Sequence, residues 1–197
     1  MQASKSDIDR RRRRRRRRVQ VIVIYIAMAV GLAWFFELQT TTTVIFVRHA
    51  EKVLEPADDP DPGLSEAGQR RAAELARQLV DADVVAGVDA IYSTSFRRTE
   101  ETVQPVAAAL SLPITSYDAS NTETIMDEIV KKHKGKIILV VGHSNTIPAL
   151  IGNMGASKKV PPIEEGEYDN IYIVSIPWFG KTKTIRLRYG TPYVPVE

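Results

Sequence analysis

The sequence predicts an α/β fold in three layers (α/β/α), with helices on both faces of a mainly parallel sheet, preceded by one amino-terminal transmembrane helix. Two observations support this prediction. Short apolar runs alternate with amphipathic stretches from residue 44 onward, which is typical of β-α units. Ahead of them, nine consecutive arginines precede an 18-residue run that is almost entirely apolar and is long enough to cross a bilayer.

The expected elements alternate along the domain. Strands are predicted at 44–47, 89–93, 114–117 and 137–142, helices at 65–80, 96–110 and 122–134, and two further strands at 168–176 and 183–189. Ser65 is expected to cap the first of these helices and Asn121 or Thr122 the third, which Gly135 ends. Pro105 should kink or shorten the second helix, because proline removes a backbone hydrogen bond.

The region before the domain divides into three segments. Residues 1–18 are an arginine-rich tail containing Arg10–Arg18, residues 19–36 are the apolar anchor, and residues 37–43 link it to the domain at 44–197. Cationic segments stay in the cytoplasm, so we expect a single-pass protein of the cell membrane with the domain outside the cytoplasm. A bacterial inner membrane is the simplest location. A cleavable signal peptide is the alternative, although its apolar region is normally shorter.

Charge is divided unevenly between the tail and the rest of the chain. Residues 1–18 carry ten Lys or Arg and two Asp or Glu, a net charge of +8, which leaves −5 for residues 19–197. The arginines adjoin the apolar run and have no interleaved aromatic residues, so their expected partner is anionic lipid headgroups and not nucleic acid. The sequence has no cysteine, which excludes disulfides and thiolate chemistry.

Four short motifs end expected strands or open expected helices. They are Arg48-His49-Ala50, Leu64-Ser65-Glu66-Ala67-Gly68, the run from Ser93 to Arg98-Thr99, and Gly142-His143. In this order and spacing they resemble the motifs of the histidine phosphatase superfamily, the phosphoglycerate mutase-like proteins. The match spans nearly all of residues 43–197. Ligands of open α/β sheets bind at the carboxyl ends of the strands, where these motifs are expected.

The resemblance implies a phosphoric monoester hydrolase with four residues at its active site. His49 would be the nucleophile and form a phosphohistidine, and His143 would stabilise the transferred phosphoryl group. Arg48 and Arg98 would bind the phosphate oxygens through forked, charge-assisted hydrogen bonds. Two permanent positive charges disfavour a third, which should keep His49 neutral and nucleophilic at pH values near its ordinary titration range of about 6.5.

Neighbouring residues raise two further expectations. Counted from Ser93, the family spacing selects Arg98 for the pocket and makes Arg97 a solvated neighbour. Ser144 and Asn145 follow His143 at an expected helix start, where backbone N–H groups attract anions. We expect these two residues to cap that helix and to line the substrate pocket.

The general acid that protonates the leaving oxygen has three candidates in this sequence. Many family members carry an aspartate directly after the second histidine, where this chain has Ser144. Asp118, Glu123 and Glu51 are the candidates, and each is equally well interpreted as a solvated or helix-capping carboxylate. A missing acid matters least for good leaving groups, such as those of phosphohistidine or acyl phosphates. Neither a cofactor nor a metal site is expected.

Three other features have ordinary structural interpretations. His133 lies among lysines in the last turn of a helix and is expected to be exposed and inert. The acidic run 58–62 lacks the spacing of a calcium loop and is expected to be a turn near the pocket mouth. The glutamate-rich residues 161–168 are interpreted as an ordinary surface loop in preference to a flap over the site.

Three functions remain open. The first is a membrane-anchored, metal-independent phosphomonoesterase acting on a phosphorylated small molecule or an envelope phosphomonoester. The second is a mutase, for which the region between Arg98 and His143 is short. The third is an inactive module that binds a phosphorylated ligand or a partner. The complete set of four residues argues against the third, because a binding pocket needs no nucleophile.

Overall fold

The structure is a computed structural model that describes residues 5–37, 41–81, 87–156 and 160–195. The chain divides into two units, Met1–Gln39 and Thr40–Glu197. Helix α1 (Lys5–Glu37) belongs to the first unit, and a sheet with its covering helices belongs to the second. Residues 1–4 of the expected tail and 38–40 of the expected linker lie outside the described residues.

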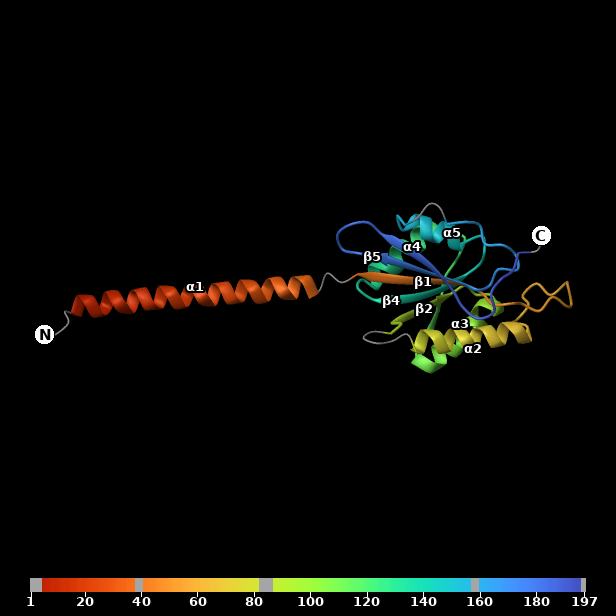
Figure 1. The fold of residues 1–197 in the computed structure, drawn as a ribbon, viewed down its shortest axis with the longest axis horizontal. Coiled ribbons are helices and arrows are strands. Elements are labelled where there is room, and N and C mark those ends of the chain that lie inside the picture. The colour runs from red at the N-terminus through yellow and green to blue at the C-terminus, as the bar shows by residue number, and fades with distance from the viewer. Residues whose placement is uncertain (1–4, 38–40, 82–86, 157–159, 196–197) are drawn as a thin grey trace. The chain divides into compact units, whose positions relative to one another are not determined.

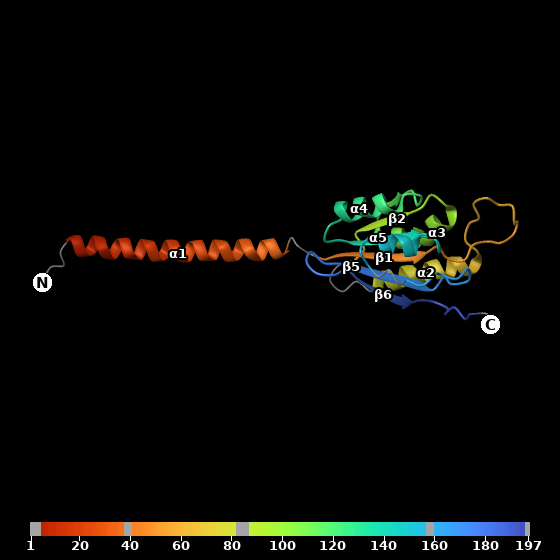
Figure 2. The same ribbon diagram turned by 90° about the horizontal axis from the view of Figure 1, so that it is seen from above.

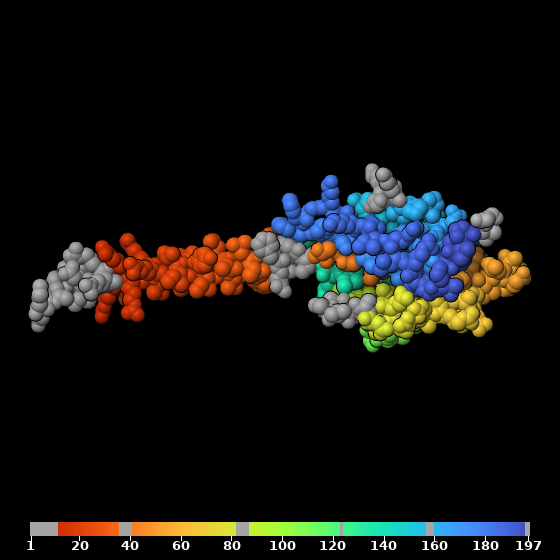
Figure 3. All heavy atoms as spheres, viewed as in Figure 1, coloured from red at the N-terminus to blue at the C-terminus, as the bar shows by residue number. Residues whose placement is uncertain are grey.

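Helix α1 joins the arginine block and the apolar run without a break. The stretch Arg12–Phe35 includes an 18-residue window of mean hydropathy 1.9, none of which is buried within the structure. The described side chains of this helix lie in the open (Figure 3). By length and composition α1 fits a membrane span, and a signal sequence has the same properties.

The second unit is built on one mixed sheet of six strands in the order β3-β2-β4-β1-β5-β6. The strands β1 (Thr42–Arg48), β2 (Ala90–Ser93), β3 (Ile114–Ser116) and β4 (Ile137–Gly142) run parallel. The strands β5 (Asn170–Ile176) and β6 (Lys183–Arg188) are antiparallel to their neighbours and extend the sheet beyond β1 (Figure 2). The six strands that the sequence predicts are therefore all present.

Helices cover both faces of this sheet, as predicted. Helices α2 (Glu66–Asp81) and α3 (Arg97–Leu110) lie on one face, and α4 (Thr122–Lys132) and α5 (Ile147–Asn153) lie on the other (Figure 1). The short helix α5 is not among the helices whose ranges the sequence analysis gave. Side chains alternate along a strand, so Ile45 and Val47 of β1 pack toward α2 and α3, while Val44 and Phe46 pack toward α4 and α5.

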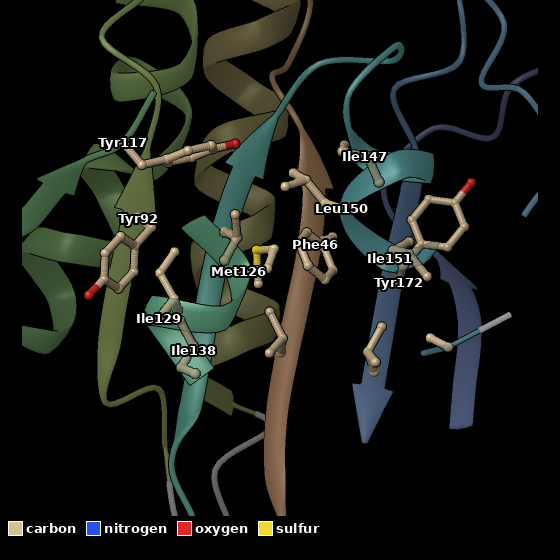
Figure 4. Close-up of a cluster of buried hydrophobic side chains, with 14 of the residues drawn as sticks. Phe46, Tyr92, Tyr117, Met126, Ile129, Ile138, Ile147, Leu150, Ile151 and Tyr172 are labelled. Atoms are coloured by element: carbon tan, nitrogen blue, oxygen red, sulfur yellow. The ribbon is translucent and has the colours of Figure 1, made fainter. Parts of the chain in front are cut away.

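The larger core cluster places the start of α5 directly over β1. Phe46 is fully buried there beside Ile147, Leu150 and Ile151 of α5 (Figure 4). Burying side chains of this size stabilises the fold by roughly 1.5–3 kcal/mol each. Because α5 follows β4 closely in sequence, this packing also fixes the turn that carries His143.

The predicted helix boundaries are largely confirmed. Ser65 caps α2 by accepting a 3.2 Å hydrogen bond from the Gly68 amide, and Asn121 caps α4. Gly135 follows the end of α4 with a φ of 75°, which glycine adopts without strain. Helix α3 continues beyond Pro105 to Leu110, so the proline does not end it.

The expectation that His133 is exposed is wrong. Its Nε2 lies 2.9 Å from the Tyr92 hydroxyl, and the two rings meet edge to face. His133 is half-buried at the end of α4 and ties this helix to β2. The lysines around it in sequence predict a solvated position, but the side chain turns inward because a buried strand offers it a hydrogen-bond partner.

Candidate active site

The register of β1 and β4 brings His49 and His143 together. Arg48, the last residue of β1, pairs with Gly142, the last residue of β4. The His49 amide then donates a 3.0 Å hydrogen bond to the Gly142 carbonyl. The two histidines that follow these parallel strands lie with ring centroids 5.3 Å apart. Both strands therefore deliver a histidine to the same edge of the sheet.

His49 is held in the tautomer that a nucleophile needs. Its Nδ1 lies 2.8 Å from the Ala50 carbonyl oxygen, which can only accept a hydrogen bond, so Nδ1 carries the proton and Nε2 keeps its lone pair. Burial lowers the pKa of His49 to about 3, and the positive charge of Arg48 adds to the effect. The sequence prediction of a neutral His49 agrees with this direction. Its pKa lies far below 6.5 because burial, and not charge alone, acts on it.

His143 is fixed by a pair of threonine hydroxyls. Its Nε2 lies 3.1 Å from Thr94 Oγ1, which lies 2.8 Å from Thr99 Oγ1. Both threonines are buried. Burial and, to a smaller extent, the positive charges of Arg98 and Arg48 lower the pKa of His143 to about 4. Both pocket histidines are therefore neutral near pH 7.

Arg98 enters the pocket and Arg97 does not. The Arg98 guanidinium lies over the Phe96 ring, 4.2 Å from its centroid, and its side chain is 16% exposed. The Arg97 side chain is 60% exposed and pairs with Glu101. The Arg97 amide, at the start of α3, donates to the carboxylate of Asp61. One aspartate of the acidic run 58–62 thus caps α3 and fixes the helix that carries Arg98.

Arg48 is held by a segment more than a hundred residues away. Its Nη1 donates to the carbonyl oxygens of Glu164, at 2.7 Å, and Glu167, at 3.2 Å. The Tyr168 ring covers the guanidinium, with its centroid 4.2 Å from Cζ. Strand β5 is antiparallel to β1, so the residues that precede β5 return to the edge where β1 ends. The interpretation of 161–168 as an ordinary surface loop is therefore wrong.

A buried threonine joins the Arg48-His49-Ala50 segment to α3. The Thr102 hydroxyl accepts a 2.9 Å hydrogen bond from the Ala50 amide and donates one of 2.6 Å to the Arg98 carbonyl. Thr102 is fully buried. This one side chain therefore couples the position of His49 to the helix that carries Arg98, a role that the sequence analysis did not identify.

The second motif is structural. The Ser65 amide and hydroxyl both donate to the Glu51 carbonyl, two residues after His49. A Cβ on Gly68 would collide with that same carbonyl oxygen. Glycine at this position lets the first turn of α2 pack against the backbone that follows His49. The motif thus supports the backbone that follows His49 and does not line the cavity described below.

These elements surround a cavity of about 400 Å³. Its lining combines the four predicted residues with neighbours from the loops at this edge: Arg48, His49, Lys52, Phe96, Arg98, Ala119, His143, Ser144, Asn145, Thr146, Glu165 and Tyr168. Ser144 and Asn145 thus lie where a substrate would bind. The expectation that they cap the next helix is wrong, because α5 begins after Thr146, whose hydroxyl accepts from the His143 amide.

The carboxylates named as candidate general acids are not found in the lining of this cavity among the described residues. Asp118 is exposed, bonded to Ser120, and lines a neighbouring hollow of about 460 Å³. Glu51 forms an ion pair with Arg71 at 2.8 Å on the far side of the catalytic segment. The side chain of Glu123 lies outside the described residues. Among the described carboxylates, Glu165 alone lines the cavity, and the sequence analysis did not single it out because it lies in the supposed surface loop.

Within the described residues, the structure places no cluster of three or more His, Cys, Asp or Glu side chains that could hold a metal ion. The two pocket histidines are flanked by arginines, and the one lining carboxylate lies in the loop before β5. The polar groups that converge on the cavity are therefore mainly cations and hydrogen-bond donors. Such a set suits an oxyanion.

Comparison of the sequence with protein families agrees with this chemistry. The model of the histidine phosphatase superfamily (branch 1) matches residues 44–121, which include His49, the helix α2 motif and Arg98. No curated protein matches the chain significantly. The family resemblance identified from the four motifs is therefore confirmed by an independent match over the first part of the domain.

Solved structures share the fold. The protein histidine phosphatase SixA complexed with tungstate is 19% identical, with a TM-score of 0.59 over 74% of this chain and 96% of SixA. A mycobacterial glucosyl-3-phosphoglycerate phosphatase is 14% identical, with a TM-score of 0.54 over 68% and 90%. A phosphoserine phosphatase mutant from Entamoeba histolytica is 16% identical, with a TM-score of 0.51 over the same shares. The sequence match over residues 44–121 and the shared fold therefore both agree with the resemblance to the histidine phosphatase superfamily.

Proposed function

We propose that this protein is a phosphomonoesterase that acts through a phosphohistidine on His49, without a metal ion. One observation carries the proposal. His49 is buried and neutral, with Nδ1 committed to the Ala50 carbonyl, and shares one cavity with two arginines and a second neutral histidine. A free ring nitrogen among fixed cations is the arrangement that attack on a phosphate dianion requires.

In the proposed reaction the two arginines bind the non-bridging oxygens of the phosphate. His49 Nε2 attacks phosphorus, a P–N bond forms, and the bond from phosphorus to the leaving oxygen breaks. His143, held by Thr94, stabilises the phosphoryl group in the transition state of its transfer. Water then attacks the phosphohistidine, the P–N bond breaks and inorganic phosphate leaves. The cations neutralise the charge that would otherwise repel the attacking group.

The carboxylates near the cavity support a preference for substrates whose leaving group needs little protonation. Asp118 and Glu51 do not line the cavity, and Glu165, which does, is an exposed residue whose charge acts on Arg48. Phosphohistidine and aryl phosphates carry leaving groups of this kind. The likeness to SixA, a protein histidine phosphatase, points in the same direction. We therefore expect such substrates to be hydrolysed faster than alkyl phosphates.

The proposal includes a membrane anchor. Residues 19–36 would span the bilayer, Arg10–Arg18 would bind anionic headgroups, and the phosphatase domain would face away from the cytoplasm toward envelope phosphomonoesters. Its support is the long apolar helix and the exposed arginines from Arg12 to Arg18. Protease accessibility of the domain in sealed cells and permeabilised cells checks the orientation. Cleavage after the apolar run, seen as a shorter mature chain, would favour a signal peptide.

The activity is tested with the full chain in detergent. Phosphate release from p-nitrophenyl phosphate, phosphohistidine and an alkyl phosphate is measured in the presence of EDTA, with His49→Ala as the control. Turnover that survives EDTA and disappears in the variant supports the proposal. Tight binding of phosphate without turnover above the variant would instead favour an inactive module that binds a phosphorylated ligand.

A further inference from the structure

Arg48 offers only part of its guanidinium to a substrate. Both protons of Nη1 are used by the Glu164 and Glu167 carbonyls. Its Nε is buried and has no hydrogen-bond partner among the described residues. An unpaired buried donor is costly, and Nε together with Nη2 forms one edge of the planar fork. Nη1 is thus committed to the loop, and the rest of the guanidinium is left to bind an oxyanion in the cavity that Arg48 lines.

The loop that holds Arg48 is itself held by a residue outside the cavity. Arg188, at the end of β6, donates to both carboxylate oxygens of Asp169, at 2.9 and 2.7 Å, and to Glu167 at 3.1 Å. The second oxygen of Glu167 accepts from the Glu164 amide at 3.2 Å. One chain of contacts therefore runs from Arg188 through a carboxylate to the two carbonyls that grip Arg48.

The two carboxylates depend on Arg188 for their burial. The Glu167 and Asp169 side chains are 7% and 1% exposed, whereas Arg188 is 40% exposed. Two buried carboxylates so close in sequence repel each other, and removing their shared cation leaves both charges buried without compensation. The loss of Arg188 should therefore displace residues 164–169 and with them the carbonyls that orient Arg48.

We propose that Arg188 is a positioning residue for phosphate binding, which acts through Glu167 and the 164–168 loop to hold the Arg48 guanidinium in place at the cavity. This inference rests on the proposed use of Arg48 for phosphate. Arg188 does not line the cavity, so it contributes no direct contact to the substrate. A displacement of about 1 Å in a positioned group can cost about 100-fold in rate.

A matched pair of variants separates this role from a loss of charge. Arg186 is an arginine of the same strand, two residues earlier, and side chains two apart share a face. Arg188→Ala is expected to weaken tungstate binding to the full chain in detergent, and to lower kcat/KM for p-nitrophenyl phosphate, by about 10- to 100-fold. Arg186→Ala should change the tungstate affinity and kcat/KM by less than about threefold, since no carboxylate of the described loop residues 164–169 bonds to Arg186. Arg188→Lys, which keeps the charge but not the fork, should lie between the two.

A double-mutant cycle decides whether Arg188 acts through Arg48. Arg188→Ala is combined with Arg48→Lys, and tungstate affinity is measured for all four chains, with thermal melts to confirm that each is folded. The proposal expects the double variant to bind as weakly as Arg48→Lys alone. Additive losses, or an Arg188→Ala chain that binds like the wild type, would overturn it. If tungstate binding depends on Arg188 but the chain shows no turnover, the phosphatase assignment fails and the positioning role of Arg188 stands. If the wild-type chain binds no tungstate, both the phosphatase assignment and the positioning role fail.

Discussion

The two sides of the cavity differ in how firmly they are built. On the phosphate side, His49, His143, Arg48 and Arg98 are each fixed by a hydrogen bond or a ring contact to residues of another element or of their own loop. The proposed leaving-group side includes Glu165, an exposed residue of the loop before β5. The molecule thus specifies the transfer of a phosphoryl group more closely than the group from which it is taken.

The difference has a physical cause. Three of the four groups proposed to bind phosphate lie at the ends of parallel strands, where register and core packing determine the position of each side chain, and Arg98 lies in the first turn of α3. The leaving-group side is formed by loops whose side chains face water. Preorganised charge at a buried site contributes more to catalysis than charge at the surface. Substitutions on the phosphate side should therefore have larger effects on catalysis than those on the leaving-group side.

The largest effect is expected at the nucleophile. His49→Ala should lower kcat by at least about 1,000-fold, because it removes the proposed nucleophile. His133→Ala is the matched control, since His133 binds Tyr92 outside the cavity. That control should keep its activity at temperatures where it is folded. Steady-state hydrolysis of p-nitrophenyl phosphate measures both, and equal losses in the two variants would contradict the assignment.

The neighbouring arginines provide the second comparison. Arg98→Ala should lower kcat/KM by about 100- to 1,000-fold, because it removes a buried cation that stabilises the transferring phosphoryl group. Arg97→Ala should change it by less than about threefold, since the Arg97 side chain is largely solvated. The same kinetic assay measures both. A reversed order would show that the family spacing from Ser93 selects the wrong arginine.

Acidification should destabilise the fold through the pocket histidines. The pKa of His49 is about 3 in the folded chain and about 6.5 in the unfolded chain, so the unfolded state binds more protons between these values. Stability is therefore lost as pH falls below 6.5, by about 2 kcal/mol at pH 5 from His49 alone. Thermal melts at pH 7 and pH 5 should show a smaller loss for His49→Asn. An equal loss would contradict the burial of a neutral histidine.

The smallest effect is expected among the carboxylates. Asp118→Asn should change kcat/KM by less than about threefold for p-nitrophenyl phosphate and for an alkyl phosphate, because Asp118 faces a neighbouring hollow. Glu165→Gln should lower kcat/KM more for the alkyl phosphate than for p-nitrophenyl phosphate, because Glu165 lines the cavity and the alkyl leaving group needs more protonation. A large loss in Asp118→Asn, confined to the alkyl substrate, would identify Asp118 as the acid and give the leaving-group side a defined role.

The phosphate side could be predicted from the sequence because each of its residues follows or adjoins a strand with a clear apolar pattern. Arg48, His49 and His143 are tied to the ends of β1 and β4, and Arg98 to the start of α3. The contacts that orient them could not be predicted. The carbonyls that bind Arg48 belong to Glu164 and Glu167, which follow it by 116 and 119 positions in the sequence. Polar loop residues of this kind carry no periodic signal.

Burial explains the remaining differences. The sequence predicts a neutral His49 from its charged neighbours, but the size of its pKa shift depends on desolvation, which only the packed domain determines. His133 was assigned to solvent because lysines surround it in sequence, although Tyr92 from another strand binds it. Pairings of this kind depend on which elements pack together. Local sequence patterns do not carry that information.

Direct detection of the phosphoenzyme tests the central claim. The full chain is mixed with p-nitrophenyl phosphate, quenched in alkali within the first turnover, digested and analysed by mass spectrometry. The account predicts a phosphoryl group on His49 that is stable in alkali, lost in acid, and absent from His49→Ala. Turnover with phosphate on another residue, or with no phosphoenzyme while substrate is being consumed, would contradict nucleophilic catalysis by His49.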